Sequence, residues 1–256
     1  MTAPIPQSTT LSSRTIAIFF NRLVHAFAKH WLLLFNLMIG IYVWLPWLAP
    51  VFMKLGWVSA GNLIYAIYST QCHQLPERSF FLFGDKFMYS LAEVQAAWRN
   101  TNQPFILRQF IGNETMGWKV AWSDRMVSMY TTIFFVGVLH GAIRKWLRPM
   151  PIWAFVLSAL PMAIDGGTHL ISDLAGIGNG FRDSNAWLAF LTNNAFSPLF
   201  YVGDAVGSFN WWMRLITGII FGVGIVWLAY PHLEEAFAEV VHDIESKFQR
   251  VGLEMS

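Results

Sequence analysis

The sequence predicts an all-α integral membrane protein that crosses the bilayer about four times. Hydrophobic residues make up 55% of the 256 residues and charged residues only 12%, about half the charged share of a soluble globular domain. Four stretches reach the roughly 20 apolar residues that a spanning helix needs. These spans are residues 31–53, 126–146, 152–172 and 211–230.

The segment before the first span, residues 1–30, is predicted to be cytoplasmic and amphipathic. Ile16, Phe19 and Leu23 recur at helical spacing and share one side. Such a helix either lies on the membrane surface or packs against neighbouring helices, and the pattern leaves both open. The segment is longer than the charged region of a signal peptide, so we expect the first span to act as a retained signal-anchor.

Two spans carry residues that shape a helix. The first holds Pro46 and Pro50 near its end, where it is expected to kink or to finish early. The fourth holds Gly218 and Gly222, a small-xxx-small face that favours close packing against another helix.

The distribution of positive charge predicts the orientation. Arg144, Lys145 and Arg148 fall in the short connection between the second and third spans. By the positive-inside rule this connection and both termini are cytoplasmic. The connections 54–125 and 173–210 are then outer segments, the first being long enough to be translocated despite its charges.

The outer segments are predicted to fold rather than to serve as linkers. Residues 62–68 form an apolar run too short to span, which indicates an interfacial or re-entrant helix. Residues 90–99 and 185–191 are expected to form further short helices. After the fourth span, residues 231–256 are predicted to form a cytoplasmic amphipathic helix.

Asp165 is the most informative single residue, because it falls inside the third span. A carboxylate at that depth costs about 2.5–3.5 kcal/mol on insertion scales and usually faces the protein interior. His169 lies one turn further along the same face. Depth along antiparallel helices predicts a direct Asp165–Arg214 ion pair. The alternative to a functional role is that Asp165 only holds two helices together.

The predicted topology brings eight polar residues to the outer end of the bundle. They are Cys72, His73, Glu77, Arg78, Arg125, Asp165, His169 and Arg214. Polar side chains that converge in an apolar setting usually line a site, so we call this set the polar outer cluster. The alternative is an ion-paired lid that seals the bundle.

Cys72 and His73 are the candidates for catalysis or metal binding. A thiolate and an imidazole both bind zinc, but a structural zinc site takes four such ligands. Nucleophilic catalysis would require a base within reach of the sulfur. Neither signal identifies a cofactor, and binding of a metal ion is left as an alternative. A net charge of +2 without a basic run interleaved with aromatics argues against a nucleic-acid partner.

Three stretches resemble the prokaryotic multi-pass membrane family catalogued as domain of unknown function 2085. They are Cys-His-Gln-Leu-Pro-Glu-Arg-Ser-Phe at 72–80, Pro-Met-Ala-Ile-Asp-Gly at 161–166, and Asn-Trp-Trp-Met-Arg-Leu-Ile-Thr-Gly-Ile-Ile-Phe-Gly at 210–222. The resemblance implies a prokaryotic plasma membrane and supplies no activity. Family members often carry Cys-x-Arg-Cys-x-Gly-x-Tyr at the start of the second span. Here Ser123 and Met126 replace both cysteines, so a three-thiolate cluster cannot form in this chain.

Three functions remain open from the sequence. The first is a non-enzymatic accessory or binding subunit, with the lipid bilayer and other membrane-protein subunits as partners. The second is a small transporter or a proton- or ion-linked carrier, which requires Asp165 to face a water-filled cavity. The third is a membrane thiol enzyme or metal-binding protein that acts through Cys72 and His73, which requires an exposed Cys72 within reach of a base such as His169. We favour the first, because no catalytic motif is present.

Overall fold

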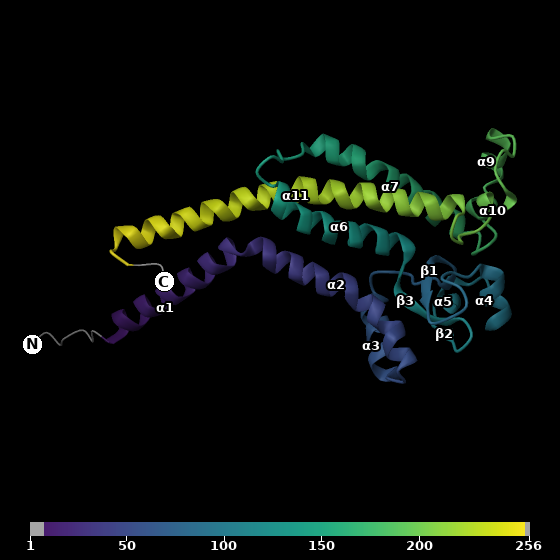
Figure 1. Cartoon of the computed structure of the whole chain (residues 1–256), viewed down its shortest axis with the longest axis horizontal. Coiled ribbons are helices and arrows are strands. Elements are labelled where there is room, and N and C mark those ends of the chain that lie inside the picture. Colours follow the sequence, from purple (N-terminus) through teal and green to yellow (C-terminus); the bar gives the residue numbers. More distant parts are fainter. Residues whose placement is uncertain (1–7, 254–256) are drawn as a thin grey trace, which may run out of the picture.

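The computed structural model describes the backbone of residues 8–253 and the side chains of residues 14–253. Four helices are long and apolar enough to cross a membrane: α2 (Trp31–Lys54), α6 (Asp124–Ile143), α7 (Ile152–Asp173) and α11 (Phe209–Arg250). They run side by side in an elongated bundle (Figure 1). The predicted fold class, an all-α membrane protein with about four spans, is confirmed.

Close packing between α6 and α11 forms the centre of the bundle. A Cβ atom on Gly222 would lie 2.8 Å from the carbonyl oxygen of Met129, and one on Gly218 would overlap the Ser128 side chain. Both glycines therefore let the two backbones approach, as the small-xxx-small spacing predicts.

The first span does not end at its prolines. α2 continues through Pro46 and Pro50, both buried, to Lys54, so the expectation that the helix finishes early is wrong. The chain bends instead at His30, where α1 (Ser8–Lys29) meets α2 (Figure 1).

α1 packs against the last part of α11. His25 Nε2 lies 3.0 Å from Glu245 Oε1, and the rings of Phe27 and Phe237 are 5.7 Å apart. Of the two placements predicted for α1, the structure shows packing on a neighbouring helix, while much of its apolar side remains exposed.

α11 is a single helix of 42 residues that includes Pro231. At 1.5 Å per residue it is about 63 Å long, roughly twice the thickness of a bilayer core. The amphipathic C-terminal helix is thus continuous with the fourth span, and the predicted boundary after residue 230 is not a break. The protruding part runs beside α1 (Figure 1).

A small antiparallel sheet at the opposite end of the bundle was not predicted. Its strands β1 (Ser79–Leu82), β3 (Gly117–Ser123) and β2 (Gly112–Asn113) lie in that order, with Phe81 paired to Lys119. β3 carries a nearly continuous run of buried residues. We call this end of the bundle the sheet end.

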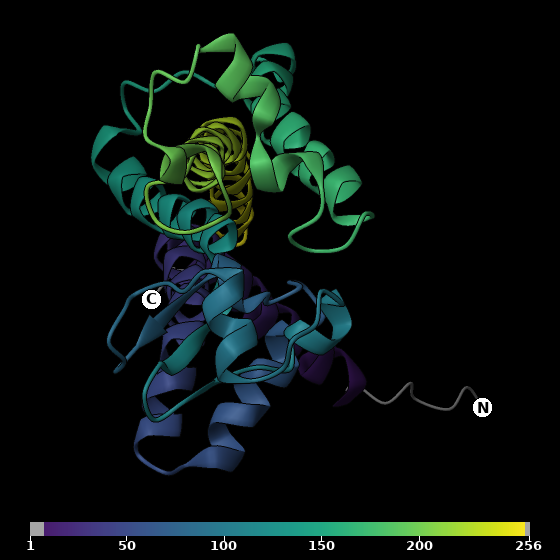
Figure 2. The ribbon, with the colours of Figure 1, turned by 90° about the vertical axis from the view of Figure 1, so that its right-hand side faces the viewer.

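Short helices from two connections lie at the sheet end, those of the first connection beside the sheet and those of the second around the start of α11 (Figure 2). The first connection contributes α3 (Val58–Tyr68), the 3₁₀ turn η1 (Pro76–Arg78), α4 (Leu91–Ala97) and α5 (Pro104–Leu107). The connection between α7 and α11 contributes α8 (Phe181–Ser184), α9 (Ala186–Leu191) and α10 (Pro198–Tyr201). The short helices expected within residues 90–99 and 185–191 are confirmed, and Ser90 starts α4 through a capping box with Glu93.

Candidate functional site

Arg214 anchors a buried network of ion pairs at the sheet end. It lies near the start of α11 and is 2% exposed. Its Nε donates to both carboxylate oxygens of Asp124, on the first turn of α6, at 2.9 and 2.8 Å. Its Nη1 donates to Asp204, in the connection just before α11. Arg214 therefore ties α11 to α6 and to that connection.

Arg78 extends the network to the first connection. From η1 it donates two parallel hydrogen bonds to Asp173, the last residue of α7, at 2.7 and 2.8 Å. Its Nε donates to Asp204 at 2.8 Å. Burial alone would raise the pKa of Asp204, but Arg78 and Arg214 outweigh it and hold this pKa well below its usual range.

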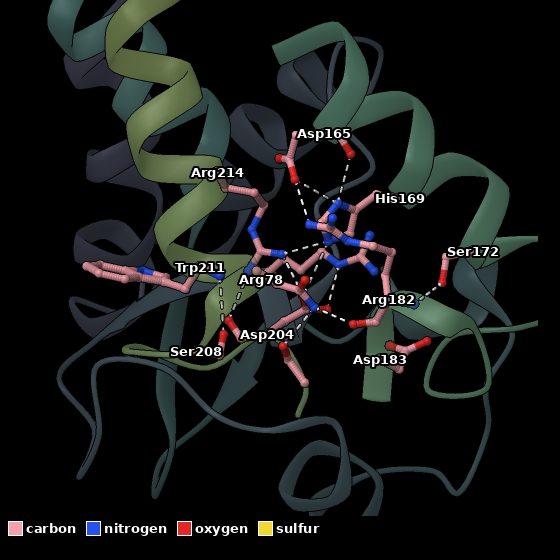
Figure 3. Close-up of polar contacts among 12 residues, drawn as sticks. Arg78, Asp165, His169, Ser172, Arg182, Asp183, Asp204, Ser208, Trp211 and Arg214 are labelled. Carbon is pink, nitrogen blue, oxygen red and sulfur yellow. Dashed lines mark hydrogen bonds and ion pairs between the residues drawn. The ribbon is translucent and has the colours of Figure 1, made fainter. Parts of the chain in front are cut away.

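Asp165 is shared by two arginines. Arg125 on α6 and Arg182 on α8 each donate to one of its oxygens at 2.7 Å, and Asp165 is 2% exposed. The predicted direct pair with Arg214 is therefore wrong, because Asp124 and Asp204 occupy that guanidinium. His169 joins the two halves, with ring nitrogens 3.5 Å from Asp165 Oδ1 and 3.5 Å from Arg214 Nη1 (Figure 3).

The charges in this network are balanced. Four arginines, Arg78, Arg125, Arg182 and Arg214, are matched by four carboxylates, Asp124, Asp165, Asp173 and Asp204. Buried ion pairs offset their desolvation only when the geometry is good and further hydrogen bonds satisfy both partners. The paired hydrogen bonds from Arg78 to Asp173 and the sharing of Asp204 by Arg78 and Arg214 meet that condition in this part of the network. The network thus has the character of the ion-paired lid considered from the sequence.

Two buried groups lie outside these pairs. Neither carboxylate oxygen of Glu77 has a hydrogen-bond partner within the described part of the chain, and burial raises the pKa of Glu77 to about 7. Lys119 Nζ donates to the carbonyl oxygens of Gln74 and Arg108, both at 2.7 Å. Burial lowers the pKa of Lys119 to about 7. Both pKa values therefore lie near neutral pH.

A cavity of about 470 Å³ lies against one side of the network, between α7, the start of α6, α5 and residues 71–78. Six of the eight predicted cluster residues line it: Cys72, His73, Arg78, Arg125, His169 and Arg214. The other two, Glu77 and Asp165, are buried and are not among its lining residues. Six residues of the polar outer cluster therefore line one cavity in the structure.

Cys72 and His73 do not converge on a common point. The Cys72 sulfur is 3.4 Å from Ser123 Oγ and accepts backbone N–H groups of Gln74 and Ser123, each at 3.4 Å. Cys72 is 7% exposed, whereas His73 is exposed. Over the described residues, no three His, Cys, Asp or Glu side chains are grouped to hold a metal ion.

Several residues of the site lie outside the predicted set of eight. Those absent from the polar outer cluster are Asp124, Asp173, Arg182, Asp204 and Arg108. One signal could have found two of them. The segment 173–210 is mostly apolar or small and holds few charges, so Arg182, its only basic residue, and Asp204 needed partners.

A family model described as "Predicted membrane protein (DUF2085)" matches residues 114–228. The chain resembles this family. The match covers α6 and α7 and reaches into α11, so it includes all four network aspartates and the arginines on α6, α8 and α11. The resemblance predicted from the sequence motifs is confirmed.

The chain is also similar to one curated protein. It is named "Uncharacterized protein MJ1492", from Methanocaldococcus jannaschii, and is 29% identical over 165 residues. These residues cover 60% of this chain and 79% of the relative. No solved structure matches the chain.

Proposed function

We propose that the protein is a non-enzymatic binding subunit of the membrane, whose ligand occupies the cavity at the sheet end. The observation that carries the proposal is the cavity itself, about 470 Å³ in volume and lined by six residues of the polar outer cluster. This volume is in the range of small-molecule sites, which combine an apolar lining with a few placed polar groups.

The ion-pair network supports this proposal because it fixes the cavity wall in advance. The guanidinium groups of Arg78 and Arg214 are each held by two carboxylates. Side chains locked by such contacts lose little further freedom when a ligand arrives, which improves affinity. A wall assembled from α6, α7, α11 and η1 also makes the site dependent on the folded bundle.

The contacts of two residues favour binding over the alternatives. Both oxygens of Asp165 accept from arginines, and Asp165 is not a lining residue, whereas a carrier would expose this carboxylate to a water-filled cavity. The contacts of the Cys72 sulfur are with Ser123 and Gln74 rather than with an imidazole. A thiol enzyme would require a base at that position.

The charge distribution supports a placement in the prokaryotic plasma membrane with both termini cytoplasmic. Arg144, Lys145 and Arg148 follow α6 at the end of the bundle opposite the sheet, and Arg144 Nη1 is 2.9 Å from Glu234 Oε1 in the protruding part of α11. Positive residues in short connections stay in the cytoplasm. The sheet end and its cavity then face outward, where other membrane subunits are proposed as partners.

The experiment is to identify what the full chain retains when it is extracted in polymer-bounded membrane discs. His73→Trp would fill the cavity without removing a network contact, since His73 is an exposed lining residue. His30→Trp, at the exposed bend between α1 and α2, is the matched control. We expect native mass spectrometry to show a bound small molecule or lipid that His73→Trp loses and His30→Trp keeps. Identical bound species in all three proteins would overturn the proposal.

A further inference from the structure

The cavity contains one cation that the network leaves unmatched. Arg108, at the end of α5, is a lining residue, and its Nη2 donates to the carbonyl oxygen of Ser69 at 2.9 Å. Within the described part of the chain no carboxylate lies within ion-pair distance of Arg108. Because the four aspartates are already matched by four other arginines, Arg108 gives the cavity a net positive charge.

A second arginine in the wall has unused donors. Arg125 Nη2 donates a hydrogen bond to Asp165, while Arg125 Nε is buried without an acceptor among the described residues. A buried donor that lacks a partner is unfavourable. An anionic ligand in this cavity would supply acceptors to a wall that already lacks them.

The lining also includes apolar residues, and three of these are exposed at the surface. Phe105 is 72% exposed, Leu170 63% and Leu174 82%. Leu170 belongs to the last turn of α7, and Leu174 directly follows that helix. Because α7 is the most exposed of the four candidate spans, its outward side chains contact lipid when the chain is in a bilayer. The cavity is therefore bordered by acyl chains on this side.

We propose that the ligand is an anionic membrane lipid, bound by its phosphate at Arg108 and Arg125 with an acyl chain along Leu170 and Leu174. This inference rests on the proposed binding function and names its ligand class. Guanidinium groups form strong charge-assisted bonds to phosphate oxygens. A lipid enters from the bilayer, so the charged group reaches the arginines without crossing an aqueous path. No covalent step is involved.

The test compares lipid binding by two arginine variants in the full chain. Arg108→Gln removes the unmatched charge without touching the network. Arg99→Gln is the control, because Arg99 lies over the Trp98 ring, 4.8 Å from its centroid, and does not line the cavity. The probes are short-chain phosphatidylglycerol, short-chain phosphatidylcholine and inorganic phosphate, each titrated by native mass spectrometry in detergent.

We expect phosphatidylglycerol to bind more tightly than phosphatidylcholine, and Arg108→Gln to weaken phosphatidylglycerol about tenfold, as one charge-assisted contact would. Arg99→Gln and the charge-conserving Arg108→Lys should retain binding. Equal affinity for both lipids would overturn the anion site. Inorganic phosphate binding as tightly as the lipid would make the ligand a soluble anion and overturn the lipid assignment.

The two proposals fail in different ways. In one outcome, His73→Trp loses a bound molecule, but Arg108→Gln keeps it and lipids of different charge bind equally well. The binding function is then supported and the lipid inference is wrong. In the other outcome, wild type and His73→Trp carry the same bound molecules and have equal affinities for every probe. Both the binding function and the lipid inference are then wrong. Because Arg108 makes no ion pair within the described chain, folding of Arg108→Gln is checked simply by its unchanged unfolding temperature.

Discussion

Asp124 and Arg214 lie opposite each other across the contact between α6 and α11, with Arg214 Nε 2.8 Å from the nearer carboxylate oxygen. Both side chains are 3% exposed. The pair lies at the same end of these helices as the cavity, and the glycine contacts of Gly218 and Gly222 follow within the next two turns of α11. Helix packing and charge pairing therefore act on the same pair of helices, and the charge pair also positions a lining residue.

Removing one partner of this pair should destabilise the fold strongly. Asp124→Ala leaves the Arg214 charge buried with fewer acceptors, for which we expect a loss of roughly 3–5 kcal/mol in the free energy of unfolding. Combining it with Arg214→Met should cost less than the sum of the single changes, by about 1–3 kcal/mol. Denaturant unfolding in detergent measures both. Asp243→Ala, on the exposed part of α11, is the control; strict additivity would show that the pair is not coupled.

Asp165→Asn tests whether this carboxylate is structural. Arg125 and Arg182 share it, so neutralising Asp165 leaves two cations facing a neutral amide. We expect a lower unfolding temperature, corresponding to roughly 3–5 kcal/mol. A carrier would behave differently: the variant would keep its stability and lose ion flux in proteoliposomes. That second pattern would return Asp165 to a role in transport.

Glu77 should make stability depend on pH. Burial raises its pKa from 4.5 to about 7 in the folded protein, so the folded state binds a proton more tightly than the unfolded state. The contribution of Glu77 to the free energy of unfolding is therefore highest at low pH. It falls as pH rises from about 4.5 to 7 and is constant at higher pH. The full effect is about 3 kcal/mol.

The measurement is the free energy of unfolding of wild type and Glu77→Gln at pH 5 and pH 8. The glutamine has no proton to lose, so the variant should gain stability relative to wild type as pH rises. Glu114→Gln is the control, because Glu114 is largely exposed. A constant difference between wild type and Glu77→Gln at both pH values would contradict the raised pKa.

Accessibility of cysteines tests the orientation. Cys72 is 7% exposed, so a membrane-impermeant maleimide should label the native protein slowly from either side. His73→Cys in a Cys72→Ser background moves the thiol to an exposed position at the sheet end. We expect labelling in intact cells, and none for Lys145→Cys in the same background until the membrane is opened. The reverse pattern would place the sheet end in the cytoplasm.

The sequence was sufficient for the spans because a spanning helix has a strong signature: about 20 consecutive apolar residues. The convergence of Arg78, Arg125, His169 and Arg214 followed from topology alone, since antiparallel spans return to the same end of the bundle. The Gly218 contact was likewise readable, because its spacing specifies a face without reference to the partner helix.

Other features depend on how helices are rotated and how connections fold, and the spacing of residues along the sequence does not determine either. Which aspartate meets Arg214 is decided by the rotation of α6 and by the fold of the connection that carries Asp204. The sheet was missed because the residues of β3 are buried on both faces, so they lack the alternation that indicates a strand. Its partner β1 is also distant along the chain.

The length of α11 gives the molecule a mechanical property. One unbroken helix joins Arg214, in the cavity wall, to the segment that pairs with α1 about 45 Å away. A rigid rod of that length converts a tilt of about 5° at one end into a displacement of roughly 4 Å at the other. Its weak point is Pro231, where a backbone hydrogen bond is missing and bending is easiest. A tilt at the cavity end is therefore carried to the contact with α1 as long as the helix stays straight at Pro231.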